Sequence, residues 1–213
     1  MFISIDGGDG TGKSTQVQRF CQWLREQGHT VVACRDPGST RLGEAVRELL
    51  LGRHDLAIRR RSEMLLYMAA RAQLVEELIR PALELGQTVV TDRYLLANVV
   101  YQGYGGGLDV DALWELGRQA TGGLMPELTI VLDMPSAQAA SRIDRQLDRM
   151  ESQGAAFHQR VRAGFLTEAA RHPGTMVVID ATRSVEQVQA DIRAAATTKL
   201  RRKAEGGRMK AEG

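Results

Sequence analysis

The sequence is poor in asparagine, lysine and cysteine, and each shortage excludes a class of site. Asn98 is the only asparagine, and Lys13 is the only lysine before Lys199, although the chain has 28 basic residues. The Asn-Lys-x-Asp motif with which ordinary GTPases recognise guanine is therefore absent. The two cysteines, Cys21 and Cys34, are too few for a disulfide framework and have no metal-site spacing.

Long apolar runs and strong net charge are also missing. No apolar stretch reaches the roughly 18 residues that a membrane-spanning helix needs. The start, MFISIDGG, lacks the basic segment and apolar run of a signal peptide. The formal net charge is only +2, which does not indicate a general nucleic-acid-binding surface. We therefore expect a cytoplasmic protein with neither a membrane nor a specific nucleic-acid partner.

Short apolar segments alternate with helical patterns along the chain. Each apolar segment is hydrophobic nearly throughout, which is typical of strands buried on both faces of a parallel sheet. The predicted strands are residues 2–6, 30–35, 88–92, 127–133 and 175–180, and helical patterns cover 14–28, 41–52, 62–86, 109–123 and 184–200. Pro81 predicts a kink or restart in the third of these helices. The sequence thus predicts an α/β fold, a five-stranded parallel sheet with helices on both faces.

The chain shows no linker, so we interpret residues 1–200 as one domain. Residues 136–160 are rich in Arg, Asp and Gln and poor in apolar side chains. This composition predicts a helical hairpin with an exposed, movable tip. Residues 201–213 are polar, basic and glycine-containing, which predicts a disordered tail.

The segment Gly7–Ser14, GGDGTGKS, matches the pattern G-x-x-x-x-G-K-[ST] between a predicted strand and a predicted helix. Glycines let backbone N–H groups point at phosphate oxygens, and the helix N-terminus adds positive potential. Lys13 is a compact point charge for the β- and γ-phosphates, which the wide, planar fork of arginine does not replace. Ser14 Oγ is a candidate Mg²⁺ ligand. The loop predicts phosphate binding, but an ATPase, a kinase and a pure binding module all stay open.

Further polar clusters lie at strand ends or on helices that face them. They are DPGST at 36–40, AAR at 69–71, DRY at 92–94, Asn98 and YQG at 101–103. Open α/β sheets bind ligands at the carboxyl ends of their strands, so these clusters predict a second substrate site. Arg71 and Arg93 can clamp a phosphate bidentately. Tyr67, one helical turn before Arg71, can stack on a base.

The motifs together resemble one family. FISIDGGDGTGKSTQ, RDPGST, YMAARAQL, DRYLLANVVYQG, LTIVLD, DRME followed by FHQRVRAGFL, and VIDAT stand in the order seen in the thymidylate kinase (dTMP kinase) family. The resemblance extends to about residue 198. It implies a P-loop nucleoside monophosphate kinase fold of the adenylate-kinase kind, with a small helical lid near 136–160 and a homodimer. It also implies phosphoryl transfer from ATP to dTMP with Mg²⁺, as a step of dTTP biosynthesis.

The resemblance assigns roles to the residues that match the family's motifs. The nucleotide cofactor would lie on Gly7, Gly8, Asp9, Gly10, Thr11, Gly12, Lys13, Ser14, Thr15, Arg142 and Ala181. The acceptor would lie on Arg35, Pro37, Tyr67, Arg71, Arg93, Asn98, Tyr101 and Gln102. Ser14 and Asp92 would serve the metal, and catalysis would depend on Lys13, Asp9, Arg93, Arg145 and Arg149. Asp9 would contact the acceptor's 3′-hydroxyl, and Tyr101 would crowd a 2′-hydroxyl.

Some family members carry arginine at the place of Gly10, and others supply arginines from the lid. This chain, with Gly10 and with Arg142, Arg145 and Arg149 in the lid segment, resembles the second type. A cation that arrives as the lid closes can neutralise charge on the transferred group.

Plainer interpretations also stay open at this point. The lid arginines can form a solvated helix face, and Arg71 can be an ion-pair partner of Glu63 or Glu76. The chain as a whole can be another P-loop nucleotide or deoxynucleoside kinase of the same fold, or a non-catalytic nucleotide-binding module.

Overall fold

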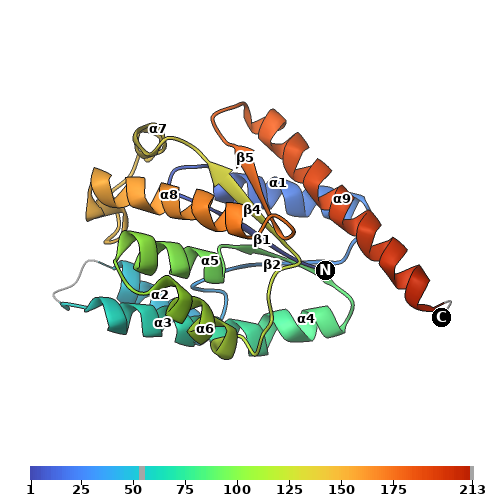
Figure 1. Cartoon of the computed structure of the whole chain (residues 1–213), viewed down its shortest axis with the longest axis horizontal. Coiled ribbons are helices and arrows are strands. Elements are labelled where there is room, and N and C mark those ends of the chain that lie inside the picture. Colours follow the sequence, from blue (N-terminus) through green and yellow to red (C-terminus); the bar gives the residue numbers. More distant parts are fainter. Residues whose placement is uncertain (53–55, 212–213) are drawn as a thin grey trace.

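The structure is a computed structural model that describes the backbone of residues 1–52 and 56–211 and the side chains as far as residue 201. Five parallel strands form one sheet in the order β2-β3-β1-β4-β5 (Figure 1). They are β1 (Phe2–Gly7), β2 (Val31–Arg35), β3 (Thr88–Asp92), β4 (Leu128–Asp133) and β5 (Met176–Asp180). The predicted parallel sheet is confirmed, and every predicted strand end lies within about one residue of the observed one.

Helices cover both faces of the sheet, as predicted. On one face lie α1 (Lys13–Glu26) and α9 (Val185–Ala211), which contact each other. The other helices are α2 (Arg41–Leu51), α3 (Arg60–Leu74), α4 (Arg80–Glu84), α5 (Leu95–Asn98), α6 (Val110–Ala120), α7 (Ser136–Ser141) and α8 (Ala155–Arg171). Of these, α3, α4, α6 and α8 pack on the opposite face (Figure 1).

Successive residues of each strand point to opposite faces, so the sheet separates two apolar cores. Ile3 and Ile5 pack with Phe20 and Ile192 under α1 and α9. Phe2 packs on the other face with the second group of helices. Burial of one such side chain contributes about 1.5–3 kcal/mol to the stability of the fold. The two cores together therefore hold the strands in place, and with them the loops that follow the strand ends.

The single helix predicted over 62–86 is interrupted. A π-helical turn, η1 (Val75–Ile79), separates α3 from α4. Pro81 lies one residue into α4 and explains the interruption, because proline lacks an N–H and its ring crowds the carbonyl four residues earlier. A second π-helical segment, η2 (Val99–Gly105), follows α5.

The helical hairpin predicted over 136–160 forms only at its two ends, where α7 and the start of α8 are helical and the two helices contact each other. The short α7 ends at Ser141, and the chain is irregular until the 3₁₀ turn η3 (Glu151–Gln153) and the start of α8. Asp148 Oδ1 accepts hydrogen bonds from the backbone N–H groups of Met150 and Glu151, each at 2.8 Å. Such local side-chain bonds compete with the helical pattern, so the lid segment folds as a loop.

The C-terminal segment also differs from its prediction. Helix α9 continues to Ala211, so the backbone from 201 onward is helical rather than disordered, and residues 212–213 lie outside the described part. In the described part of the chain, no helix combines the length and the apolar character needed to cross a membrane.

Candidate active site

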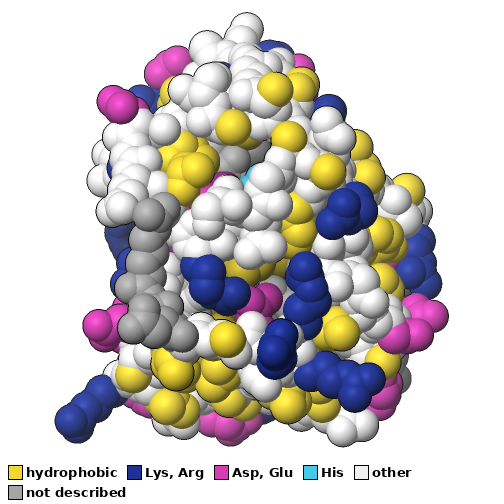
Figure 2. All heavy atoms as spheres, turned by 90° about the vertical axis from the view of Figure 1, so that its left-hand side faces the viewer, with side chains coloured by type: hydrophobic (Ala, Val, Ile, Leu, Met, Phe, Trp, Pro, Cys, Tyr) yellow, Lys and Arg dark blue, Asp and Glu magenta, His cyan; other side chains and the backbone are white. Residues whose placement is uncertain are grey.

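The candidate site is a cavity of about 690 Å³ at the carboxyl ends of β1 and β3. The two strands are neighbours, with Ile5 beside Asp92. Their following loops, the P-loop and the Asp92–Arg93 turn, therefore meet there. On the face seen in Figure 2, basic side chains surround a recess in which acidic side chains are visible.

Most of the residues predicted for the site line this cavity. These are Asp9, Gly10, Gly12, Lys13, Ser14, Thr15, Arg35, Pro37, Tyr67, Arg71, Asp92, Arg93, Asn98, Tyr101, Gln102, Arg142 and Arg145. The structure does not place Gly7, Gly8, Thr11, Arg149 or Ala181 among the lining residues. Gly8 and Thr11 instead face a smaller cavity of about 100 Å³ behind the loop.

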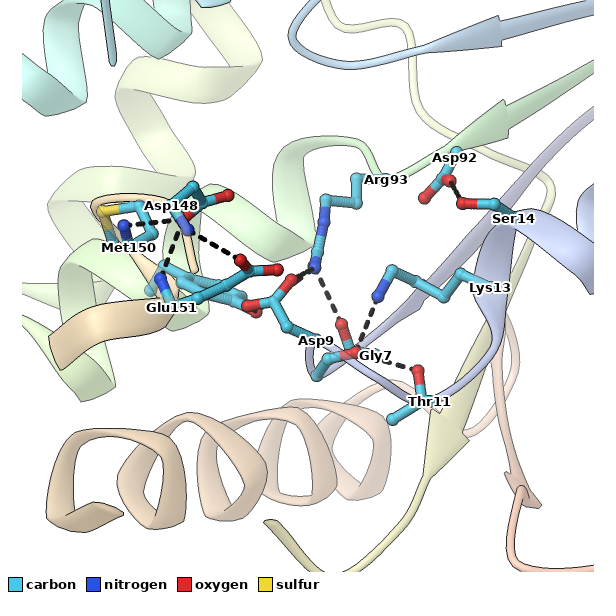
Figure 3. A network of polar contacts seen from close by, with 12 residues as sticks. Gly7, Asp9, Thr11, Lys13, Ser14, Asp92, Arg93, Asp148, Met150 and Glu151 are labelled. Atoms are coloured by element: carbon cyan, nitrogen blue, oxygen red, sulfur yellow. Dashed lines mark hydrogen bonds and ion pairs between the residues drawn. The ribbon is translucent and has the colours of Figure 1, made fainter. Parts of the chain in front are cut away.

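The P-loop curls around its own lysine (Figure 3). Gly10 and Gly12 have φ angles of 78° and 88°, a conformation that side chains disfavour. Lys13 Nζ donates to the Gly8 carbonyl at 2.6 Å, and Thr11 Oγ1 donates to the same oxygen at 2.8 Å. The lysine thus spans the concave side of the loop, where a bound anion would lie.

Lys13 is buried, and its charge is poorly compensated. Burial, together with the nearby Arg93 charge, lowers the pKa of Lys13 to about 8, although Asp9 and Asp92 oppose the shift. A buried cation whose charge costs free energy is stabilised when an anion binds beside it. The loop is therefore an electrostatically favourable place for phosphate.

Two oxygen ligands stand together at the edge of the P-loop. Ser14 Oγ donates to Asp92 Oδ2 at 3.0 Å, and both residues line the cavity. A hydroxyl and a carboxylate are hard ligands that suit Mg²⁺, which is usually held by few protein groups together with water and phosphate oxygens. The described residues contain no cluster of three or more His, Cys, Asp or Glu that could hold a metal by itself.

Arg93 links the two loops. Its backbone has φ 68°, a left-handed conformation that costs an ordinary residue about 1–2 kcal/mol. Arg93 Nη1 donates to the Gly7 carbonyl at 2.8 Å, and Nη2 donates to Asp9 Oδ1 at 2.5 Å. Tyr101 donates to the other Asp9 oxygen at 2.6 Å. Burial alone would raise the pKa of Asp9, but the charges of Arg93 and Lys13 outweigh it and lower that pKa to about 2.

Arg71, Asn98 and Gln102 form a buried polar wall on the far side of the cavity. Arg71 Nε donates to Asp36 Oδ2 at 2.5 Å, and Arg71 Nη1 donates to Asn98 Oδ1 at 2.9 Å. Arg71 is therefore an ion-pair partner of Asp36, not of Glu63 or Glu76. Glu63 also lies in this wall, where its Oε1 accepts a hydrogen bond from Gln102 Nε2.

Tyr67 and Arg35 complete the part of the site that was predicted for the acceptor. Burial and the neighbouring Glu63 raise the pKa of Tyr67, so its ring is neutral and available for stacking. Arg35 reaches the cavity from the end of β2, where its Nη2 donates to Glu44 at 2.7 Å.

The three lid arginines make different contacts. Arg145 binds Glu151 through both guanidinium ends, at 2.8 and 2.6 Å, and Arg142 donates to the Ala181 carbonyl at 3.3 Å. Arg149 instead donates to the Leu50 carbonyl at 2.6 Å and forms an ion pair with Glu63. The interpretation as a plain solvated helix face is wrong, because this segment is not helical and each arginine has a defined partner.

Sequence reasoning assigned no role to nine of the residues that line the cavity, and five of these nine are charged. Arg47 and Asp36 line the cavity, as do Asp148 and Glu151 of the lid. Arg47 donates to the Pro37 carbonyl at 3.1 Å, and burial, with the nearby Arg35 charge, lowers its pKa. Asp36 stands in the DPGST motif and could have been found there, but Arg47 is one of two arginines on α2 with no motif around it.

Comparisons with known proteins agree with this geometry. The family model "Thymidylate kinase" matches residues 5–192. Two proteins named thymidylate kinase, from Exiguobacterium sp. and Clavibacter sepedonicus, are 46% and 47% identical over 90% and 92% of this chain and 92% and 94% of their own. A third, from Rhodopirellula baltica, is 45% identical over 90% of this chain and 78% of its own.

A solved structure is similar as well. The crystal structure of thymidylate kinase from Ehrlichia chaffeensis has a TM-score of 0.77 and 29% sequence identity, and it covers 92% of this chain and 98% of that one.

Proposed function

The chain belongs to the thymidylate kinase family and phosphorylates dTMP, and we propose that ATP with Mg²⁺ is the phosphoryl donor. One observation carries the proposal: a complete phosphate-binding loop and a polar wall line the same cavity, and between them Arg93 forms an ion pair with Asp9 of the loop. Phosphoryl transfer needs two substrates held in line and strong charge stabilisation, and no covalent nucleophile.

The donor side would be held by the P-loop. The backbone of Gly7–Thr15 and the Lys13 ammonium would bind the phosphates, while Arg142 and the Ala181 loop, which contact each other at 3.3 Å, would flank the adenine. Ser14 and Asp92 would hold Mg²⁺, which when bound neutralises charge on the phosphate oxygens.

The acceptor side would be held by the opposite wall. Arg93, with Arg35, would bind the dTMP phosphate, and Tyr67 would stack on the thymine ring. Arg71, Asn98 and Gln102 would bind the edge of the pyrimidine, and Tyr101 would lie against the deoxyribose. Because both Asp9 oxygens accept bonds from Arg93 and Tyr101, we assign Asp9 mainly to orienting Arg93, with the 3′-hydroxyl as its further partner.

The three lid arginines would have different roles: Arg145 at the transferred phosphoryl group, Arg142 at the adenine, and Arg149 as an anchor of the lid. Arg142 and Arg145 line the cavity, so Arg145 is our candidate for the cation that meets the transferred phosphoryl group. Arg149 is held by Leu50 and Glu63 on the acceptor side, which supports an anchoring role.

We further propose a homodimer and a cytoplasmic location. Leu42 of α2 and Leu65 of α3 are about half exposed, and the two helices contact each other, so together they offer an apolar surface to a second copy. Sedimentation of the wild type and of a Leu65→Glu variant tests the dimer; a wild type that sediments as a monomer at micromolar concentration would contradict it. Cell fractionation tests the location.

A substrate panel tests the function. ATP with dTMP, dUMP, dCMP or AMP is assayed by ADP release, and dTMP is expected to be preferred. Lys13→Met is the matched inactive control. Family membership favours this activity over a different nucleotide kinase or a non-catalytic binder, and a strong preference for AMP or dCMP would defeat the assignment.

A further inference from the structure

The backbone of Arg93 is held in an uncommon conformation beside the P-loop. Among the described residues other than glycine, only Arg93 and Ser39 have a positive φ. A residue keeps such a conformation only where the surrounding structure enforces it, and such residues cluster at functional sites. The groups that enforce it at Arg93 are therefore candidates for a role in the reaction.

Hydrogen bonds fix the peptide groups on both sides of Arg93. Its N–H donates to the carbonyl of Ile5 in β1 at 3.0 Å. Its carbonyl accepts from Thr91 Oγ1 at 2.8 Å. The first bond joins two backbone groups, so it does not depend on which side chain stands at position 5. The second bond needs a hydroxyl at position 91, so it is a property of this sequence.

The hydroxyl of Thr91 has a fixed position and a fixed direction. Thr91 is 0% exposed and lies in β3, which pairs with β2 on one side and with β1 on the other. Because a carbonyl only accepts, the single hydroxyl hydrogen must point at the Arg93 oxygen. Thr91 does not line the cavity, so it can affect a substrate only through Arg93.

The backbone conformation of Arg93 decides where its guanidinium lies (Figure 3). In the observed conformation Nη1 donates to the Gly7 carbonyl and Nη2 to Asp9. A return of φ to the ordinary negative range would turn the Cα–Cβ bond and carry the guanidinium away from both partners. Displacement of a positioning group by about 1 Å can lower a rate 10²-fold, so the bond from Thr91 bears on function.

We propose that Thr91 is a positioning residue for the acceptor phosphate. Its hydroxyl holds the left-handed backbone of Arg93 and thereby the guanidinium that binds the phosphate of dTMP. This inference rests on the proposed function, which assigns the acceptor phosphate to Arg93. Because other side chains would bind the base and the sugar, Thr91 contributes to binding of the phosphate and not to binding of the nucleoside.

The test separates phosphate binding from nucleoside binding. Isothermal titration calorimetry gives the Kd of dTMP and the Kd of thymidine, and the ratio of the two measures what the phosphate contributes. Thr91→Val removes the hydroxyl and keeps the branched shape that suits a strand. The Kd of dTMP is expected to rise about fivefold to tenfold, which is the effect of one lost hydrogen bond, while the Kd of thymidine stays within about twofold.

Two further variants identify the hydroxyl of Thr91 as the cause. Thr91→Ser keeps a hydroxyl and should recover most of the wild-type ratio. Thr129→Val is the matched control, because Thr129 is 4% exposed and lies in the same row of the sheet: Ser4 of β1 stands between Thr91 and Thr129. The intervening strand separates Thr129 from β3, so this variant should keep the wild-type ratio.

An unchanged ratio in Thr91→Val, no recovery in Thr91→Ser, or an equal fall in Thr129→Val would overturn the proposal. A wild type that binds thymidine as tightly as dTMP would instead refute the assignment of the acceptor phosphate to Arg93, and this inference with it. Failure of the activity itself is seen separately, as absence of ADP release with dTMP in the wild type.

Discussion

Arg93 Nη2 lies 2.5 Å from Asp9 Oδ1, in an ion pair that ties the turn after β3 to the P-loop after β1. The two strands pair directly in the sheet, so the pair spans the two loops that would hold the two substrates. A shift of the acceptor arginine would therefore move the donor loop as well. This coupling suits a reaction whose rate depends on alignment of two phosphates.

The lowered pKa of Lys13 predicts that nucleotide affinity depends on pH. Below its pKa of about 8 the side chain is protonated and ready for phosphate; above it, binding must take up a proton. The Kd of ATP is therefore expected to rise as the pH goes from 7 to 9.5, by up to about tenfold per unit above pH 8. Calorimetry without Mg²⁺ measures it.

Lys13→Arg is the control for this titration, since arginine stays protonated throughout this range. Its Kd is expected to be flat over the same pH values, and its turnover is expected to be mostly lost, because a planar fork does not fit the slot that Lys13 occupies. A wild-type Kd that does not change with pH would contradict the assignment.

Gly10→Ala is expected to loosen the lid. A Cβ at Gly10 would lie 2.0 Å from the carbonyl oxygen of Ala139 in α7, so a methyl group would have to displace that helix. Gly86→Ala is the matched control: its φ of 73° resembles the 78° of Gly10, but its Cβ would meet nothing within 4 Å. In both variants the left-handed backbone lowers the free energy of unfolding by about 1–2 kcal/mol. In Gly10→Ala, overpacking against α7 lowers it by about 1–3 kcal/mol more.

Urea unfolding measures the two costs, and proteolysis of the lid segment measures its loosening. Equal destabilisation of the two variants would show that the contact between Gly10 and α7 is unimportant.

Asp36→Asn is expected to destabilise the fold strongly. Arg71 is fully buried, and Asp36 is the carboxylate that pairs with it, so the change leaves an uncompensated buried charge that costs about 3–5 kcal/mol. Asp111→Asn breaks the exposed pair with Arg171 and should cost about 0–1 kcal/mol. Urea unfolding of both compares them directly, and a loss below 1 kcal/mol for Asp36→Asn would refute the argument.

Arg145→Ala is expected to lower kcat by about 10³-fold with little change in the KM of either substrate, because the lid cation would act on the transition state. Arg118→Ala, in an exposed pair on α6, is the control and should keep wild-type turnover. ADP release at saturating dTMP and ATP gives both values. Near-normal turnover of Arg145→Ala would shift the role to another lid arginine.

The fold and the P-loop could be predicted because their signals are local. Each strand was visible as a short, mainly apolar run; β1, β3 and β4 are buried on both faces, as expected, whereas the edge strands β2 and β5 are partly exposed. The P-loop was visible because a tight loop around phosphate requires glycines and one lysine at fixed spacing. The parallel arrangement then brought Asp92 and Arg93 to the same edge as the P-loop.

The lid could not be predicted in this way. Its arginines were visible, but the local conformation depends on Asp148 and Glu151, whose carboxylates accept hydrogen bonds from nearby backbone N–H groups at the turn that leads into η3. Composition and periodicity do not separate such bonds from the exposed face of a helix.

By itself, the sequence determined the parallel sheet and the phosphate-binding loop, because these follow from patterns over neighbouring positions, and its family resemblance pointed to most of the residues that line the cavity. Only the tertiary structure decided the partners of the charged groups. Arg149 pairs with Glu63 across 86 positions and Arg71 with Asp36 across 35. Which opposite charges meet depends on how the helices pack, and a buried charge takes whichever partner the packing brings within reach.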